Sequence, residues 1–148
     1  VMRHFEKIGQ TLPKQNKKNQ MVIHGDTGPN NFIIDHRGNV YFLDFEMIRF
    51  GFLSEDLAQL VLSIVLQHSI WFFNEKLLLK TVRFFNDAFK LSYQDWVYGT
   101  GIYFLRLIER RLRSGKFLSS PRKVWLFLKH LQKHEKVLRA IKKLYEPH

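Results

Sequence analysis

Residues 23–46 read IHGDTGPNNFIIDHRGNVYFLDFE, and this stretch decides the fold expected for the whole 148-residue chain. It contains an H-x-D-x-x-x-x-N pattern, in which Asn31 follows Asp26 by five residues, and it ends in D-F-E at residues 44–46. Such spacing is typical of the loops that serve phosphoryl transfer, in which a carboxylate orients a hydroxyl group and oxygen ligands hold Mg²⁺. We interpret the rest of the chain as a scaffold around this stretch.

A β-hairpin is expected between Asn31 and Asp44. Residues 32–34 and 40–43 favour strands, and the sequence DHRGN at 35–39 is typical of a turn. A hairpin would return Asp44 to the side of Asn31, so that both could hold one Mg²⁺ ion, which prefers oxygen ligands. Asp26 lies in a Gly-flanked loop just before and fits the carboxylate that receives or orients the hydroxyl proton.

Each of these residues also has an ordinary structural explanation. Asp26 can form a turn, Asn31 can cap the start of a strand, and Asp44 can be an acid in a loop. The order of loop, hairpin and D-F-E favours the functional interpretation.

With these motifs the sequence resembles the aminoglycoside phosphotransferase and choline kinase group, the small-molecule relatives of protein kinases. The resemblance rests on HGDTGPNN at 24–31, LDFE at 43–46 and EDLA at 55–58. It implies the C-terminal lobe of a protein-kinase-like fold, an α+β and mostly helical lobe whose small hairpin carries the catalytic and metal loops. Thr27 and Gly28 depart from the family, which often has Leu or Phe and then a polar residue there.

The resemblance also assigns roles to the residues of the motif. Asp26 is expected to be the catalytic base, while Asn31 and Asp44 are expected to bind Mg²⁺ and, through it, the nucleotide. His24 is expected to support the loop structurally.

Two further acids are less sharply assigned by the resemblance. Glu46 stands where protein kinases have Gly, and it either joins the metal shell or orients the loop through hydrogen bonds. Asp56 either braces the catalytic loop or is simply an acid in the first turn of a helix.

The activity implied by the resemblance is transfer of the ATP γ-phosphate, with Mg²⁺, to a hydroxyl group of a small molecule or glycan. The basic balance of the chain favours an anionic or neutral acceptor over a polycationic one. No G-x-G-x-x-G loop and no V-A-I-K-like strand precede His24. We therefore expect the nucleotide-binding N-terminal lobe to be absent from this chain, and the chain alone to be inactive.

The expected organisation is one kinase-like lobe over residues 1–148. A leading helix and linker cover 1–20, the catalytic loop, hairpin and metal loop cover 21–53, and a helical subdomain covers 54–148. The helices are expected at residues 1–11, 54–68, 74–90, 92–113 and 120–144.

Particular residues mark the starts and faces of these helices. The expected starts are an N-cap at Ser54, a capping box of Ser92 with Asp95, and Pro121 at a first helical position. Gly99 and Gly101 indicate either close helix packing or a break. The apolar positions expected to face inward are Leu77, Leu78, Val82, Phe85, Phe89, Val124, Leu128, Leu131, Leu138 and Ile141.

The segment 47–53 is expected to be irregular, with Gly51 giving flexibility. Arg49 within it is expected to contact phosphate or substrate, or to pair with Glu46. In the basic C-terminal part, His130 and His134 lie four residues apart, but no third ligand accompanies them. Arg106, Arg110, Arg111 and Arg113 form either an anion-binding cluster or an exposed helix face with internal ion pairs.

Composition limits the alternatives. The chain is 45% hydrophobic and has no cysteine, which excludes a disordered protein and a thiolate site. Its net charge is +11, and residues 24–60, around the expected metal site, are acidic. The N-terminal sequence has no secretory leader, and we expect a cytoplasmic protein without a membrane span. The rival interpretations are a non-catalytic pseudokinase or a basic binder of nucleic acid or membrane surfaces, although no specific nucleic-acid motif is found.

Overall fold

The computed structural model describes residues 12–67, 73–113 and 121–146, so the helix expected over 1–11 lies outside the described part. The described part is an α+β structure dominated by helices, as the sequence predicts. Its helices are α2 (Leu53–Gln67), α3 (Glu75–Phe89), α4 (Tyr93–Arg113) and α5 (Pro121–Lys142). Its strands are β1 (Met21–Ile23), β2 (Phe32–Ile34), β3 (Val40–Phe42) and β4 (Arg49–Gly51). Short 3₁₀ turns are η1 (Lys17–Asn19), η2 (Pro29–Asn31) and η3 (Phe45–Met47).

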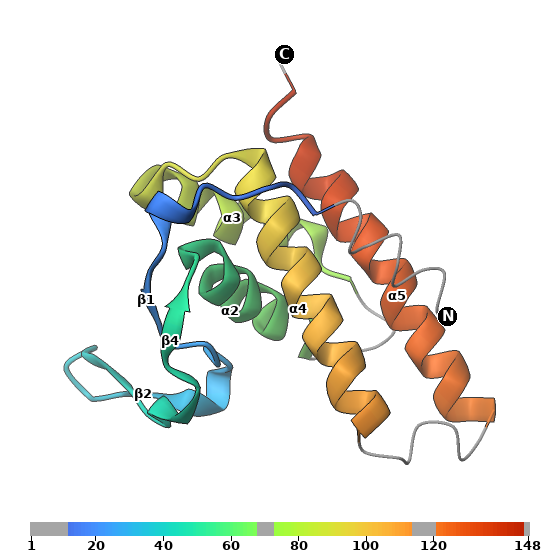
Figure 1. Cartoon of the computed structure of the whole chain (residues 1–148), viewed down its shortest axis with the longest axis horizontal. Helices are drawn as coiled ribbons and strands as arrows, with labels where there is room; N and C mark the ends of the chain where they lie inside the picture. The colour runs from blue at the N-terminus through green and yellow to red at the C-terminus, as the bar shows by residue number, and fades with distance from the viewer. Residues whose placement is uncertain (1–11, 68–72, 114–120, 147–148) are drawn as a thin grey trace.

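The helices form one body, and the strands lie on one side of it (Figure 1). Helix α4 packs across α2, and α5 runs along α4 on the side away from the strands. The buried core is built mainly from α2, with fully buried contributions from α4 and α5 such as Trp96, Phe104 and Ile141. In the described residues, no helix is both long enough and apolar enough to cross a membrane.

The expected hairpin is present. Strands β2 and β3 pair antiparallel, with Phe32 opposite Phe42 and Ile34 opposite Val40, and the pair projects from the helices (Figure 1). Asp35 shapes the turn by accepting hydrogen bonds from the side chain and backbone N–H of Asn39 and from the N–H of Arg37. These bonds, that of the Asn39 side chain first, hold the pKa of Asp35 below its ordinary value.

The prediction of an irregular segment at 47–53 is wrong in part, because residues 49–51 form strand β4. This strand pairs antiparallel with β1, so that Met21 lies opposite Gly51 and Ile23 opposite Arg49. Gly51 is buried, and a Cβ there would collide with the Ile23 side chain. It permits close packing, and flexibility is not its role here.

Helix α4 continues through Gly99, which excludes a break and confirms close packing at this position. A Cβ on Gly99 would collide with the backbone carbonyl of Ser54 at the start of α2. The absence of a side chain therefore lets α4 approach the first turn of α2, the turn that carries Glu55 and Asp56.

Two of the expected helix starts are confirmed and one is wrong. Ser92 and Asp95 form the capping box, in which the Ser92 N–H donates to Asp95 and the Asp95 N–H donates to Ser92 Oγ. Pro121 is the first residue of α5. Ser54 is not an N-cap, because α2 begins at Leu53 and the buried Ser54 hydroxyl has no hydrogen-bond partner among the described residues. The N–H of Phe52 instead donates to Glu55, three residues ahead.

Most inward positions agree with the prediction where they are described. Leu78, Val82 and Ile141 are buried, whereas Leu77 and Phe89 are largely exposed. Both exceptions lie at the border of the apolar stripe of α3, which packs on α2 and α5 through a narrower face than the sequence pattern suggested. The side chains of Val124, Leu128 and Leu131 lie outside the described part, and α5 ends at Lys142, two residues before the expected end.

Candidate active site

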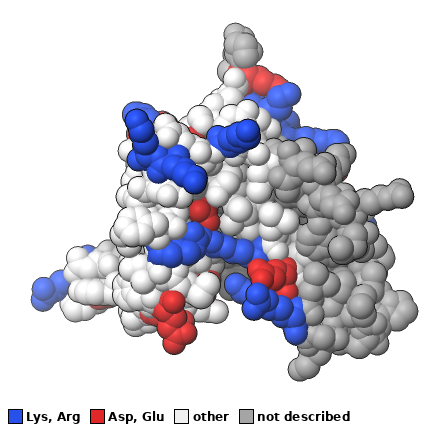
Figure 2. All heavy atoms as spheres, in the orientation of Figure 1, with Lys and Arg blue, Asp and Glu red and all other residues white. Residues whose placement is uncertain are grey.

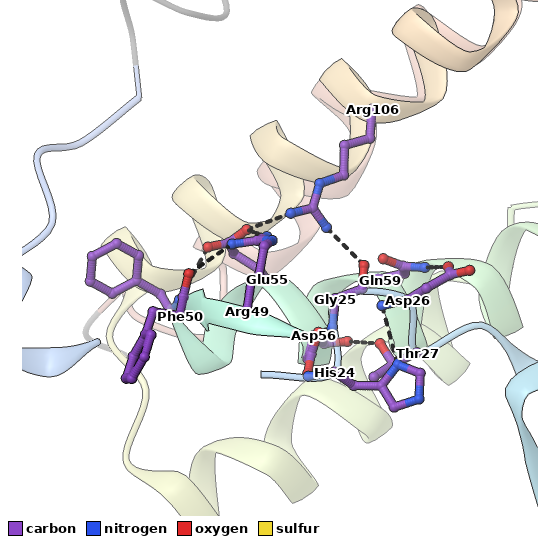
Figure 3. A network of polar contacts seen from close by, with 11 residues as sticks. His24, Gly25, Asp26, Thr27, Arg49, Phe50, Glu55, Asp56, Gln59 and Arg106 are labelled. Atoms are coloured by element: carbon purple, nitrogen blue, oxygen red, sulfur yellow. Dashed lines mark hydrogen bonds and ion pairs between the residues drawn. The ribbon is translucent and has the colours of Figure 1, made fainter. Parts of the chain in front are cut away.

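Asp56, in the first turn of α2, holds the backbone of the loop that follows β1. Its carboxylate accepts hydrogen bonds from the N–H of His24 at 2.7 Å and of Gly25 at 2.9 Å. Its own carbonyl accepts the Thr27 hydroxyl at 2.6 Å. Asp56 is buried, and two donors on a buried carboxylate fix the loop firmly. Figure 3 shows Asp56 beside His24 and Gly25.

Gly25 is required by the shape of that turn. Its φ of +81° lies in the left-handed region that glycine adopts without penalty, and a Cβ would collide with the carbonyl of Met47. The backbone of the expected catalytic loop at Gly25 therefore lies against the backbone of Met47, which follows the D-F-E sequence.

His24 links the loop to the end of the hairpin. Its Nε2 lies 2.8 Å from the Leu43 carbonyl, which can only accept, and its Nδ1 accepts the N–H of Asp26 at 3.3 Å. These partners fit the neutral tautomer with hydrogen on Nε2. The ring also packs on Phe42 and Phe45. His24 thus contacts the residues on both sides of Asp44, and its geometry is that of a structural support.

The carboxylate of Asp26 is oriented by two amide side chains. Asn31 Nδ2 donates to the Asp26 carbonyl at 2.8 Å and to Oδ2 at 3.1 Å. Gln59 Nε2, on α2, donates to Oδ1 through a short hydrogen bond (Figure 3). Gln59 was not among the residues predicted from the sequence, although its position three residues after Asp56 places both on one face of a helix.

The hairpin brings Asp44 back to Asn31 as expected. The N–H of Leu43 donates to the Asn31 carbonyl at 2.8 Å, so Asp44 follows directly on a residue bonded to Asn31. Asp44 adopts a left-handed backbone, with φ of 58° and ψ of 72°. Within the described residues its exposed carboxylate has no hydrogen bond or ion pair.

The side-chain oxygen atoms of Asn31 and Asp44 are of the kind that a hard cation such as Mg²⁺ prefers. The Asn31 amide directs its nitrogen at Asp26, which leaves its oxygen on the other side of the amide, and the Asp44 carboxylate has no hydrogen bond or ion pair with any described residue. In the part of the chain that is described, no three His, Asp, Glu or Cys side chains gather as a metal site. Two protein oxygens suffice for Mg²⁺ when phosphate and water complete its shell. Glu46 is exposed in η3, and its expected role in the metal shell stays a prediction.

A buried glutamate joins the loop to the surrounding elements. Glu55 is 4% exposed and pairs with Arg49 at 2.5 Å and with Arg106 at 2.9 Å. Arg106 also donates to the Gly25 carbonyl at 3.1 Å (Figure 3). Arg49 is therefore an ion-pair partner, as one alternative predicted, but its acid is Glu55 and not Glu46.

The basic cluster of α4 does not behave as one surface. Arg113 pairs with Glu109 on the exposed face, as predicted, whereas Arg106 turns inward to Glu55. The side chain of Arg111 lies outside the described residues, as does that of His130, while His134 is buried against the ring of Phe104. On the face drawn in Figure 2, Lys and Arg form separate groups with uncharged surface between them.

A cavity of about 340 Å³ opens beside Asp26. The loop and η2 form one wall and α2 and α4 form the others. Its described lining residues are Asp26, Gly28, Pro29, Asn30, Asn31, Gln59, Ser63, Leu66, Tyr103, Arg106, Leu107 and Arg110. The oriented carboxylate thus faces a space large enough for a small polar molecule.

Comparison with known proteins adds one match. The family model described as "Phosphotransferase enzyme family" matches residues 2–89, more than half of the chain, including the loop, the hairpin, α2 and α3. No curated protein and no solved structure matches the chain.

Proposed function

Because the chain belongs to the phosphotransferase enzyme family, we propose that it is part of a kinase that transfers the γ-phosphate of ATP to a hydroxyl group of a small molecule or glycan. The acceptor oxygen forms a bond to the γ-phosphorus, the bond from that phosphorus to the bridging oxygen breaks, and ADP leaves. The hydroxyl proton passes to the carboxylate of Asp26.

The observation that carries the proposal is the setting of Asp26. Its carboxylate is fixed by Asn31 and Gln59 and faces the cavity, so a hydroxyl group bound there meets an oriented acceptor for its proton. The loop is preorganised by Asp56 and His24, and such preorganisation is the main contribution that a protein makes to phosphoryl transfer.

Asn31 and Asp44 are the residues that would hold Mg²⁺, with Glu46 as a further candidate. When bound, Mg²⁺ neutralises charge on the nucleotide phosphates. The backbone hydrogen bond from Leu43 to Asn31 brings the residue before Asp44 next to Asn31, which supports this assignment. The helix-dominated body with this hairpin fits the C-terminal lobe of a kinase-like fold, which we propose as its architecture.

The test uses the natural gene product that contains these residues, titrated with ATP in the presence and absence of Mg²⁺. We expect Mg²⁺-dependent ATP binding that is lost in Asp44→Ala. Asp26→Asn should keep this binding and lower turnover about 100-fold or more, the usual contribution of a general base. Asp87→Asn, the same change at an exposed position of α3, is the control and should alter neither quantity.

A folded wild-type protein without metal-dependent ATP binding would overturn the proposal. It would leave the non-catalytic pseudokinase as the better explanation of the same fold. Salt-sensitive binding of DNA or anionic vesicles that survives Asp44→Ala would instead support the basic binder.

A further inference from the structure

The wall of the cavity opposite the catalytic loop is formed by one face of α4. Tyr103, Arg106, Leu107 and Arg110 line it, with spacings of three and four residues that place them on the same side of the helix. Ser63 and Leu66 of α2 also line the cavity. The lining of the cavity therefore includes the Asp26 carboxylate, apolar side chains and the guanidinium groups of α4.

The two arginines on this wall have different roles. Arg106 is committed to Glu55 and to the Gly25 carbonyl, so its charge is already used within the protein. Arg110 is exposed and takes part in none of the ion pairs among the described residues, whereas Arg113, one turn further along, pairs with Glu109. Arg110 is thus a cation that faces the cavity without a described acidic partner.

Tyr103, on the same face of α4 and seven residues before Arg110, adds a neutral donor to the cavity lining. Burial raises the pKa of its hydroxyl, an effect that the nearby charge of Arg110 partly opposes. The phenol therefore keeps its proton and can donate a hydrogen bond at neutral pH. A tyrosine hydroxyl and a guanidinium group together are donors suited to phosphate or carboxylate oxygens.

Helix α4 sets the spacing along its axis between Arg110 and Arg106, the arginine that contacts the catalytic loop. Arg106 contacts the residue immediately before Asp26, and Arg110 follows it by one turn, about 6 Å along the axis. That length is of the order of one sugar ring. Leu66 and Leu107 also line the cavity and offer apolar contact to the face of such a ring.

We propose that the acceptor carries an anionic group, a phosphate or a carboxylate, about one sugar ring away from the hydroxyl that is phosphorylated, and that Arg110 with Tyr103 binds this group. The identity of the reacting hydroxyl rests on the proposed function, while the anion site does not. A polycationic acceptor is disfavoured, since its charge would meet Arg110. The basic balance of the chain as a whole points in the same direction.

The experiment measures binding of four sugars to the natural gene product in the absence of nucleotide, by isothermal titration calorimetry. The probes are glucose 6-phosphate, glucuronic acid, glucose and glucosamine. At least one of the two anionic probes should bind about tenfold or more tightly than glucose, because charge-assisted hydrogen bonds add this much. The comparison between these two probes decides whether the site prefers phosphate or carboxylate.

Arg110→Gln should weaken the preferred anionic probe about tenfold, while Arg113→Gln should change it less than twofold. Arg113→Gln is the matched control because it removes the same charge from the same helix outside the cavity. Equal losses in both variants, no binding of either anionic probe, or a preference for glucosamine would overturn the inference.

Failure of this inference differs from failure of the proposed function. ATP turnover that is faster with glucose or glucosamine than with either anionic sugar would overturn the anion site and leave the kinase standing. Arg110-dependent sugar phosphate binding in a protein that binds no ATP would support the anion site and overturn the kinase.

Discussion

Asp44 is the residue whose local conformation is hardest to explain without a ligand. Positive φ values are uncommon for residues other than glycine, and among the described non-glycine residues only Asp44 and Lys90 have them. Lys90 ends α3, where a left-handed residue is ordinary. Asp44 caps η3 without a side-chain hydrogen bond, so its conformation gains nothing from the turn itself. Strain of this kind, in a residue with a free carboxylate, supports the metal role proposed for it.

Two substitutions at Asp44 separate its backbone from its carboxylate. Asp44→Ala and Asp44→Gly should both lose Mg²⁺-dependent ATP binding. The Gly variant should be more stable than the Ala variant by about 1 kcal/mol in the free energy of unfolding, because only glycine accepts a left-handed backbone without penalty. Urea denaturation measures the difference. Equal stabilities would mean that the backbone relaxes once the carboxylate is gone.

The packing of α4 on α2 is the contact between elements that sets the position of the site. The first turn of α2 carries Glu55 and Asp56, and α4 reaches that turn closely because Gly99 has no side chain. Helix α2 supplies Gln59, which donates a hydrogen bond to Asp26, and α4 supplies Arg106 and Arg110 to the lining of the cavity. The spacing of these helices therefore controls both the orientation of the loop and the size of the cavity.

Gly99→Ala tests this contact. Alanine favours a helix more than glycine does by about 1 kcal/mol, yet we expect the variant to lower the free energy of unfolding by about 2 kcal/mol because its Cβ collides with the Ser54 backbone. Gly28→Ala is the control, since a Cβ there meets open space, and it should change stability by less than about 0.5 kcal/mol. A stabilised Gly99→Ala variant would contradict the close approach of the two helices.

At the scale of the whole molecule, one ionic network connects segments far apart in the sequence. Glu55 on α2 binds Arg49 on β4 and Arg106 on α4, and Arg106 continues to Gly25 in the loop. Removing one member of this network should lower the free energy of unfolding, because the charges that remain are left uncompensated around a buried carboxylate.

A double-mutant cycle on Glu55→Gln and Arg106→Gln measures this connection. Each single variant should lose about 2 kcal/mol of unfolding free energy, and the coupling between them should exceed about 1 kcal/mol. Glu109 and Arg113, an exposed pair on α4, give the reference cycle, with a coupling of about 0.5 kcal/mol or less. Chemical denaturation provides both values, and equal couplings in the two cycles would refute a special role for Glu55.

Local sequence patterns predicted most of the elements of this fold. The hairpin followed from β-rich runs around DHRGN, and the start of α4 followed from Ser92 and Asp95. The pairing of β1 with β4 was not predictable, since the paired residues are 26 to 30 residues apart in the sequence and each strand is only three residues long. The missing N-cap at Ser54 has a similar cause: packing against Gly99 and the reach of Glu55 to Phe52 shift the start of α2.

The sequence by itself determined the class of the fold and the order of loop, hairpin and helices, and it predicted Asp26, Asn31 and Asp44 as the site residues, because these depend on spacing along the chain. Only the tertiary structure decided which side chains orient them. Gln59 and Arg106 reach the loop through helix packing, and their contacts with Asp26 and Gly25, across 33 and 81 residues, are not encoded in any local pattern. The cavity and its unpaired Arg110, within the described chain, likewise exist only where α2 and α4 meet the loop.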